Sequence, residues 1–392
     1  MSIPIDELTS LPPPAPIQPI YYGSVFNHET KTDLPPTVRT LREQGYTTGL
    51  SNCLIEHASS FPHRIYVVDN SGSMNQTDGQ LITATGVGRE VRIDSCTRWM
   101  EMQELVSYHV QMAALLRTPS IFRFLTDPGP SVGMQMFSVA DKGSNMIQHD
   151  VEVAMDTIQK TIADGYSTPL TWQIDEIRHS IQTMLLPATQ KKQILIVLAT
   201  DGLPTNVQGE GGTHELDRFM VALEKLEGLP ISVVVRLCTN DEKVCRFYKS
   251  IAERNLSFSV TIVDDFLAEA SAVHRHNRWL TYALPLQRLR ALGFPNTTID
   301  FLSVRPLTKL EVKEFCILLF GTSETLNLPS DVERHWKGFC THVKQLLQRE
   351  SEQWNPIAKK FTPWIDVRRL EEDYEESCCG RVCLKLRHKI CF

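Results

Sequence analysis

The sequence has no long apolar run, no basic stripe and no dense set of cysteines. Its longest apolar runs, such as ILIVLA at 194–199, are far shorter than the ~18 residues that a membrane-spanning helix needs. The formal net charge of −6, without a stripe of Lys and Arg in the body of the chain, predicts no nucleic-acid partner. Ten cysteines in 392 residues are too sparse for a disulfide scaffold, and the opening MSIPIDELTSLPPPAP lacks the pattern of a secretory signal. We therefore expect a cytoplasmic protein with reduced thiols.

Composition and length indicate a folded chain with more than one part. Hydrophobic residues make up 42% and charged residues 22%, which is usual for a globular protein. A length of 392 residues allows two or three domains of roughly 150 residues each. The first segment differs, because proline and turn-forming residues dominate LPPPAPIQP and KTDLPPT. We predict a proline-rich arm over residues 1–61, with docking of LPPPAP into a proline-reading domain as the less favoured alternative.

Short apolar runs alternate with amphipathic stretches from residue 64 onward. The runs RIYVV and QILIVLA are nearly continuous, as is typical of central strands covered on both faces. This alternation predicts an α/β domain with a doubly wound, mostly parallel six-stranded sheet flanked by helices. The predicted strands are 64–68, 120–125, 133–139, 193–199, 231–237 and 258–263. The predicted helices between them are 97–116, 146–163, 169–185, 215–228 and 241–254.

Three other segments depart from this alternation. The stretch QLITATGVGREVRID places two alternating runs around a glycine-containing turn, which predicts a hairpin just after the first strand. After about residue 265 the strand pattern fades and helical patterns follow one another. We therefore predict an α/β domain over residues 62–280, a helical C-terminal extension over 281–376 and a Cys-rich basic tail over 377–392.

Small oxygen-bearing side chains follow two of the predicted strands. The first strand is followed by Asp69, Ser71 and Ser73 on alternate residues, and the run QILIVLATDG ends with Asp201. In a doubly wound sheet, ligands bind beyond the carboxyl ends of the strands, where the strand order reverses. If these two strands flank that point, their two carboxylates face each other across one crevice.

The loop ADGYSTPLTW adds the hydroxyls of Ser167, Thr168 and Thr171. Two carboxylates and several hydroxyls, with no Cys or His nearby, make a site of hard oxygen ligands. This chemistry suits Mg²⁺ or Mn²⁺, whereas Ca²⁺ is less favoured because it takes more carboxylates than are available here.

These three segments together resemble a von Willebrand factor type A domain. In that family the pattern D-x-S-x-S, a downstream Thr and a downstream Asp form the metal-ion-dependent adhesion site, and all five positions are filled in this sequence. The resemblance covers about residues 62–280 and implies a Rossmann-like sheet. It also implies metal ligands at Ser71, Ser73 and Thr168, with Asp69 and Asp201 bound directly or through water.

The sequence departs from the family pattern at two places. Tyr166 and Ser167 stand where the family usually has two glycines before the Thr, so Thr171 remains an alternative to Thr168 as the ligand. The Pro-Leu that follows Thr168 favours Thr168. The predicted hairpin is the second departure, since it is an insertion.

The resemblance implies an adhesion-type, protein-binding module. Two carboxylates neutralise a divalent ion while the hydroxyl ligands are uncharged, so an ion whose carboxylates act through water stays electron-poor and attracts an Asp or Glu from a partner protein. The hairpin and neighbouring loops would then read the partner's surface. The alternative is an intracellular scaffold in which the metal is structural or absent and the helical extension binds the partner.

An enzyme is the main rival class, and the sequence offers no catalytic motif for it. A strand-end Asp nucleophile would need a second carboxylate two residues later or a nearby Lys, and Ser71 occupies that place. No G-x-S-x-G elbow occurs, and GEGGTH at 209–214 lacks the strand and Lys of a phosphate cradle. We interpret His149, His179 and His214 as surface or packing residues, and we predict no catalytic residues.

The C-terminal SCCGRVCLKLRHKICF mixes cysteines with basic residues. Acylation of Cys378, Cys379 and Cys383 beside the basic patch would hold the chain on an anionic membrane, which is the only membrane association that the sequence suggests. A small zinc cluster is a second reading, and a tail whose cysteines have no role is the favoured one. The residues of the zinc reading are Cys379, Cys383, His388 and Cys391.

Overall fold

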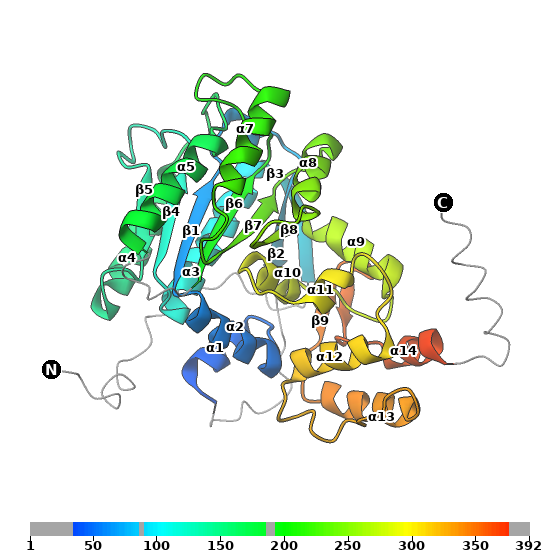
Figure 1. The fold of residues 1–392 in the computed structure, drawn as a ribbon. Coiled ribbons are helices and arrows are strands. Elements are labelled where there is room, and N and C mark those ends of the chain that lie inside the picture. The colour runs from blue at the N-terminus through cyan, green and yellow to red at the C-terminus, as the bar shows by residue number, and fades with distance from the viewer. Residues whose placement is uncertain (1–33, 86–89, 186–192, 376–392) are drawn as a thin grey trace. The chain divides into compact units, whose positions relative to one another are not determined.

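A computed structural model of the chain describes residues 34–85, 90–185 and 193–375 (Figure 1). Their contacts divide them into two compact units. The first unit comprises residues 34–269 and 284–295, and the second comprises 270–283 and 296–375. The first unit therefore includes residues 34–61, which precede the predicted start of the α/β domain. The cysteines of the predicted tail, including Cys378, Cys379 and Cys383, lie outside the described residues.

A six-stranded sheet forms the centre of the first unit and confirms the predicted α/β class. Its strand order is β5-β4-β1-β6-β7-β8, and every neighbouring pair is parallel except β4 with β5 at one edge. The strands are β1 (His63–Val68), β4 (Ser120–Phe124), β5 (Met136–Val139), β6 (Ile194–Thr200), β7 (Ile231–Leu237) and β8 (Ser259–Val263).

Helices cover both faces of this sheet, so its central strands are buried throughout (Figure 1). Along β1, Ile65 and Val67 pack into one core and Tyr66 and Val68 into the other, because successive side chains of a strand point to opposite faces. The first core includes side chains of α5 (Leu170–Ser180), α7 (Thr213–Glu224) and α8 (Glu242–Ala252). The second includes side chains of α3 (Arg98–Leu116), α4 (Ile147–Lys160) and α10 (Leu284–Ala291).

The strand order reverses between β1 and β6. From β1 the chain continues to β4 and β5 on one side, then returns to β6 and continues to β7 and β8 on the other. Val68 at the end of β1 is in register with Ala199 of β6. The residues that follow these two strands therefore meet at the reversal point, which is where a doubly wound sheet binds its ligands.

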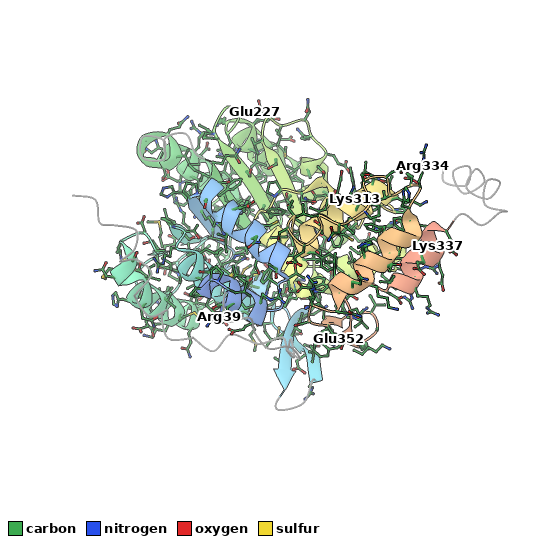
Figure 2. All side chains as sticks on the ribbon, turned by 90° about the horizontal axis from the view of Figure 1, so that it is seen from below. Arg39, Glu227, Lys313, Arg334, Lys337 and Glu352 are labelled. Atoms are coloured by element: carbon green, nitrogen blue, oxygen red, sulfur yellow. The ribbon has the colours of Figure 1, made fainter. Side chains whose placement is uncertain are left out.

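The predicted hairpin is confirmed as an antiparallel pair, β2 (Gly79–Thr85) with β3 (Glu90–Cys96). It forms a separate two-stranded sheet that extends away from the central one (Figure 2). A short 3₁₀ turn, η2 (Gly72–Asn75), joins the end of β1 to it, and α3 follows it. The first unit also contains η3 (Ser144–Met146) and the short π-helical turn η4 (Ile181–Leu185).

Part of the segment predicted as an extended arm is helical. The chain forms α1 (Pro36–Glu43) and α2 (Thr48–Ser60). Prolines at the first turn are compatible with a helix, because the first helical N–H groups have no partner in any case. Thr47 caps α2 by accepting a hydrogen bond from the Leu50 N–H, and buried leucines fix both helices to the unit.

The second unit is mainly helical, as predicted, and adds one small hairpin that the sequence did not indicate. Helix α12 (Lys309–Phe320) begins with a capping box in which Thr308 and Glu311 bond each other's backbone. Trp279 and Trp364 are almost fully buried. Arg334 and Lys337, labelled in Figure 2, are exposed. Helix α9 (Phe266–His276) begins in the first unit and ends in the second. The remaining elements are α11 (Thr297–Phe301), α13 (Trp336–Leu347), β9 (Gln353–Asn355), β10 (Lys360–Thr362) and α14 (Val367–Tyr374).

Within residues 34–85, 90–185 and 193–375, no helix is both long and apolar enough to cross a bilayer.

Gly293, in the turn after α10, gives a test of how the first unit packs. Gly293 and Gly228 both have φ of +80°, but a Cβ on Gly293 would overlap the buried Leu195 side chain, whereas a Cβ on Gly228 would meet nothing. We expect Gly228→Ala to lower the free energy of unfolding by about 1 kcal/mol through backbone strain alone. Gly293→Ala should lose about 1–3 kcal/mol more through overpacking, measured by urea unfolding. Equal losses in the two variants would contradict this packing.

Candidate functional site

Asp69 and Asp201 lie side by side at the reversal point of the sheet. Asp69 directly follows β1 and its N–H donates to the Ala199 carbonyl of β6 at 2.9 Å, while Asp201 directly follows β6. Both carboxylates are buried, with exposed fractions of 0% and 3%. The sequence predicted this arrangement from the two apolar runs, and the parallel register produces it.

A path of hydrogen bonds joins the two carboxylates through the serines. The Ser71 N–H donates to Asp69 Oδ1 at 2.9 Å, and the hydroxyls of Ser71 and Ser73 are 3.0 Å apart. The Ser73 hydroxyl then donates to Asp201 Oδ1 at 2.8 Å. On the other side, the Thr200 hydroxyl donates to Asp69 Oδ2 at 2.5 Å. Four of the predicted site residues therefore share one cluster of oxygen atoms.

The loop before α5 is fastened to the turn after β1 by backbone hydrogen bonds. The Gly72 N–H donates to the Gly165 carbonyl at 2.6 Å, and the Gly165 N–H donates to the Asn70 carbonyl at 3.3 Å. A side chain on Gly165 would overlap Thr126, so this close approach requires glycine. The Asn70 side chain in turn holds the Thr126 N–H at 2.9 Å. These contacts bring the predicted Thr loop to the carboxylates.

The structure distinguishes the two candidate threonines. The Thr168 hydroxyl lies 3.7 Å from the position that a Cβ on Gly202 would take, and Gly202 directly follows Asp201. A mutual pair of contacts fixes Thr168, since its N–H donates to the Thr205 hydroxyl at 2.7 Å and the Thr205 N–H donates to the Thr168 carbonyl at 3.0 Å. Thr171 belongs to the first turn of α5, where its buried hydroxyl has no hydrogen-bond partner among the described residues. Thr168 is thus the threonine placed beside the Asp201 segment, and the neighbouring Ser167 is buried.

Arg98 is a part of the site that the sequence reading missed. Its guanidinium donates to Asp201 Oδ2 at 2.8 Å and holds Asp78 through two bonds of 2.6 Å each. Arg98 is the first residue of α3, and Asp78 directly precedes the hairpin strand β2. Nothing in the sequence marked this arginine, because its two partners lie 20 and 103 positions away. The bridge connects the base of the hairpin to the carboxylate cluster.

Burial and the neighbouring carboxylate both disfavour the charged form of Asp69. Burial, followed by the negative charge of Asp201, raises the pKa of Asp69 to about 6, although hydrogen bonds from Thr200 and Ser71 counteract the rise. The same cluster faces Tyr248 of α8, whose hydroxyl donates to the Gly202 carbonyl at 2.9 Å. A cation at this position would offset the repulsion that raises the Asp69 pKa.

The donor atoms at the cluster fit a hard divalent cation. They are carboxylate and hydroxyl oxygens, which Mg²⁺ and Mn²⁺ prefer, and no group of three or more His, Cys, Asp or Glu side chains suited to a metal occurs among the described residues. The candidate ligands that the structure brings together are Asp69, Ser71, Ser73, Asp201 and, beside Gly202, Thr168.

The three histidines considered for catalysis lie on the surface. His149, His179 and His214 are all exposed, so of the two readings left open by the sequence, surface or packing, the surface one holds. None of them makes a hydrogen bond to a residue of the carboxylate cluster.

No family model matches this chain, and no curated protein is similar enough to count as a match.

The raised Asp69 pKa has a measurable consequence for stability. In EDTA at pH 8, Asp69→Asn should raise the free energy of unfolding by about 1–3 kcal/mol, because the fold disfavours the ionised carboxylate that the wild type carries there. At low pH the wild-type Asp69 is protonated and carries no such penalty, and the wild type loses stability as pH rises from about 4 to 6. The difference in unfolding free energy between the two proteins should therefore vanish near pH 4. Urea unfolding across this pH range measures it.

Asp78→Asn is the matched control, and its effect on the free energy of unfolding should have the opposite sign. The hydrogen bonds from Arg98 lower the Asp78 pKa, so this carboxylate stabilises the fold above its unfolded pKa and its loss should destabilise the protein at pH 8. An Asp69→Asn protein that is less stable than the wild type at pH 8 would contradict the account.

Proposed function

We propose that residues 62–280 form a domain of the von Willebrand factor type A kind, which binds Mg²⁺ or Mn²⁺ and captures an acidic side chain of a partner protein. The observation that carries this proposal is the hydrogen bond from Ser73 to Asp201 beside the buried Asp69. It places the D-x-S-x-S segment and the second strand-end carboxylate at one point. The bound ion would supply a Lewis-acidic vertex for the partner's carboxylate.

Each residue of the cluster has a role in this proposal. Ser71, Ser73 and Thr168 would contribute uncharged hydroxyl oxygens, while Asp69 and Asp201 would supply the negative charge. Thr200 and Arg98 orient the two carboxylates, since each bonds one carboxylate oxygen. Arg98 also reduces the negative charge that Asp201 offers. With less negative charge from the ligands of this chain, a bound ion would more readily accept a carboxylate from a partner than a further ligand from this chain.

The surface beside Thr168 has the character of a protein-binding rim. Tyr166, two residues before Thr168, is 80% exposed. A Cβ on Gly209 would lie 2.8 Å from the Tyr166 carbonyl, so Tyr166 adjoins the loop that carries Val207, which is 47% exposed. Exposed aromatic and apolar side chains beside a polar centre are common in protein interfaces. This rim supports a protein partner over a small-molecule ligand.

The competing scaffold function makes a different prediction. If the metal is structural or absent and the helical second unit binds the partner, removal of divalent ions leaves binding intact. If the carboxylate cluster binds the partner, a chelator abolishes it.

Calorimetric titration with Mg²⁺ tests which threonine is a ligand. Thr168→Ala should weaken Mg²⁺ binding by roughly tenfold or more, because an oxygen ligand is lost. Thr171→Ala removes a hydroxyl three residues further along, in the first turn of α5, and should leave the affinity unchanged. The assignment is wrong if both variants bind Mg²⁺ as the wild type does, or if only Thr171→Ala loses affinity.

Capture of partner proteins from a lysate, with Mg²⁺ and in parallel with EDTA, tests the function itself. The immobilised wild-type chain should retain a partner only with Mg²⁺, and Asp69→Ala should retain none. Asp217→Ala is the control, because Asp217 is an exposed carboxylate of α7 outside the cluster. Retention that survives both EDTA and Asp69→Ala would support the scaffold function instead.

A further inference from the structure

Arg64, in the second position of β1, is a buried cation without an anionic partner. Its side chain is 1% exposed, and none of its three guanidinium nitrogens meets full hydrogen-bond geometry with a partner among the described residues. The Tyr66 hydroxyl lies close enough to interact with the guanidinium, but it is neutral and supplies no counter-charge. Within the same part of the chain, no carboxylate lies within ion-pair distance of it. A buried charge is expensive unless it is paired and hydrogen-bonded, so this arginine needs a counter-charge.

Two histidines of the same unit are also buried. His57 of α2 is 5% exposed and His109 of α3 is 2% exposed, and no ring nitrogen of either meets full hydrogen-bond geometry in the described structure. For His57, the backbone of Gly293 is the nearest polar group that acts on the ring. Burial, followed by the positive charge of Arg64, lowers the pKa of each imidazole to about 3. Both rings are therefore neutral at physiological pH, and each retains one N–H to donate.

Contacts place these three side chains around one region of the first unit. Tyr66 lies on the same face of β1 as Arg64, its hydroxyl is directed toward the guanidinium, and its ring centroid is 4.9 Å from that of His109. On the other side, Leu195 is in register with Arg64 and packs against Gly293, whose backbone lies beside His57.

Aromatic side chains and cations surround this region. The His57 ring lies 4.4 Å from Phe61 and 5.9 Å from Phe294. The charged groups that act on His109 are all cations, namely Arg64, Arg288 and Arg236. Arg288 is paired with Glu104 and Arg236 with Glu101, so the excess positive charge here is that of Arg64.

We propose that Arg64, His57 and His109 form a binding site for a small monovalent anion of the chloride type. One guanidinium charge matches one anionic charge, and a divalent oxyanion would leave excess negative charge in an apolar region. The donors are guanidinium N–H groups, two imidazole N–H groups and the Tyr66 hydroxyl. The site lies at the start of β1, whereas the carboxylate cluster follows its end, so this site and the proposed metal site are separate.

Thermal unfolding in EDTA tests the site independently of divalent ions. Sodium chloride is exchanged for sodium gluconate at constant ionic strength, because gluconate carries the same charge but is a much larger anion. The wild-type midpoint should rise by about 2–4 °C for each tenfold increase in chloride above the dissociation constant. Arg64→Met should show no chloride dependence, and Arg123→Met, which removes a half-buried arginine of β4, should respond as the wild type does.

A second measurement covers the case in which Arg64→Met fails to fold. The ³⁵Cl resonance of a chloride solution should broaden when the wild-type protein is added, and bromide should reverse the broadening. The proposal is overturned if chloride and gluconate give the same midpoint for the wild type together with no excess broadening, or if Arg64→Met keeps the chloride dependence. Stabilisation by inorganic phosphate but not by chloride would overturn the monovalent assignment.

Discussion

Two carboxylates lie next to each other because β1 and β6 are parallel and end in register. With Val68 opposite Ala199, the residues after these strands must meet, and both are covered by the surrounding loops. Burial, followed by repulsion from the neighbouring Asp201 carboxylate, raises the Asp69 pKa to about 6. The serine bridge, Thr200 and Arg98 offset this repulsion in part. The helices on both faces of the sheet and the glycine contact at Gly165 hold the cluster in place.

The charges around this cluster favour a divalent cation on simple arithmetic. The hydrogen-bonded network that contains the cluster has three carboxylates, of Asp69, Asp78 and Asp201, and one guanidinium, of Arg98. Its net charge of about −2 with every group ionised equals the charge that one divalent ion neutralises. Because Arg98 and Asp78 also adjoin the hairpin, a change at the cluster would reach the hairpin through two side chains. The described contacts show this connection whatever the partner is.

Sequence patterns predicted the helices and strands that follow from features of neighbouring residues in the chain. The six strands, the helices between them and the hairpin follow from apolar periodicity, and the meeting of Asp69 with Asp201 follows from parallel strand order. Two early helices were missed, because prolines at a first turn resemble an extended arm. Arg98 could not be read from the sequence, since its role depends on contacts with Asp201 across the fold. Arg64 likewise sits in an ordinary strand, and only its burial without a partner distinguishes it.

The central claim is that the strand-end carboxylates and the nearby hydroxyls form one divalent-cation site. A crystal structure of the chain loaded with Mn²⁺, with anomalous scattering to locate the metal, tests it most directly. The account predicts a single anomalous peak between Asp69 and Asp201, within roughly 2.0–2.3 Å of the Ser71, Ser73 and Thr168 hydroxyl oxygens. A map with no peak at this position, in which the Ser73 hydroxyl still donates to Asp201, would contradict it.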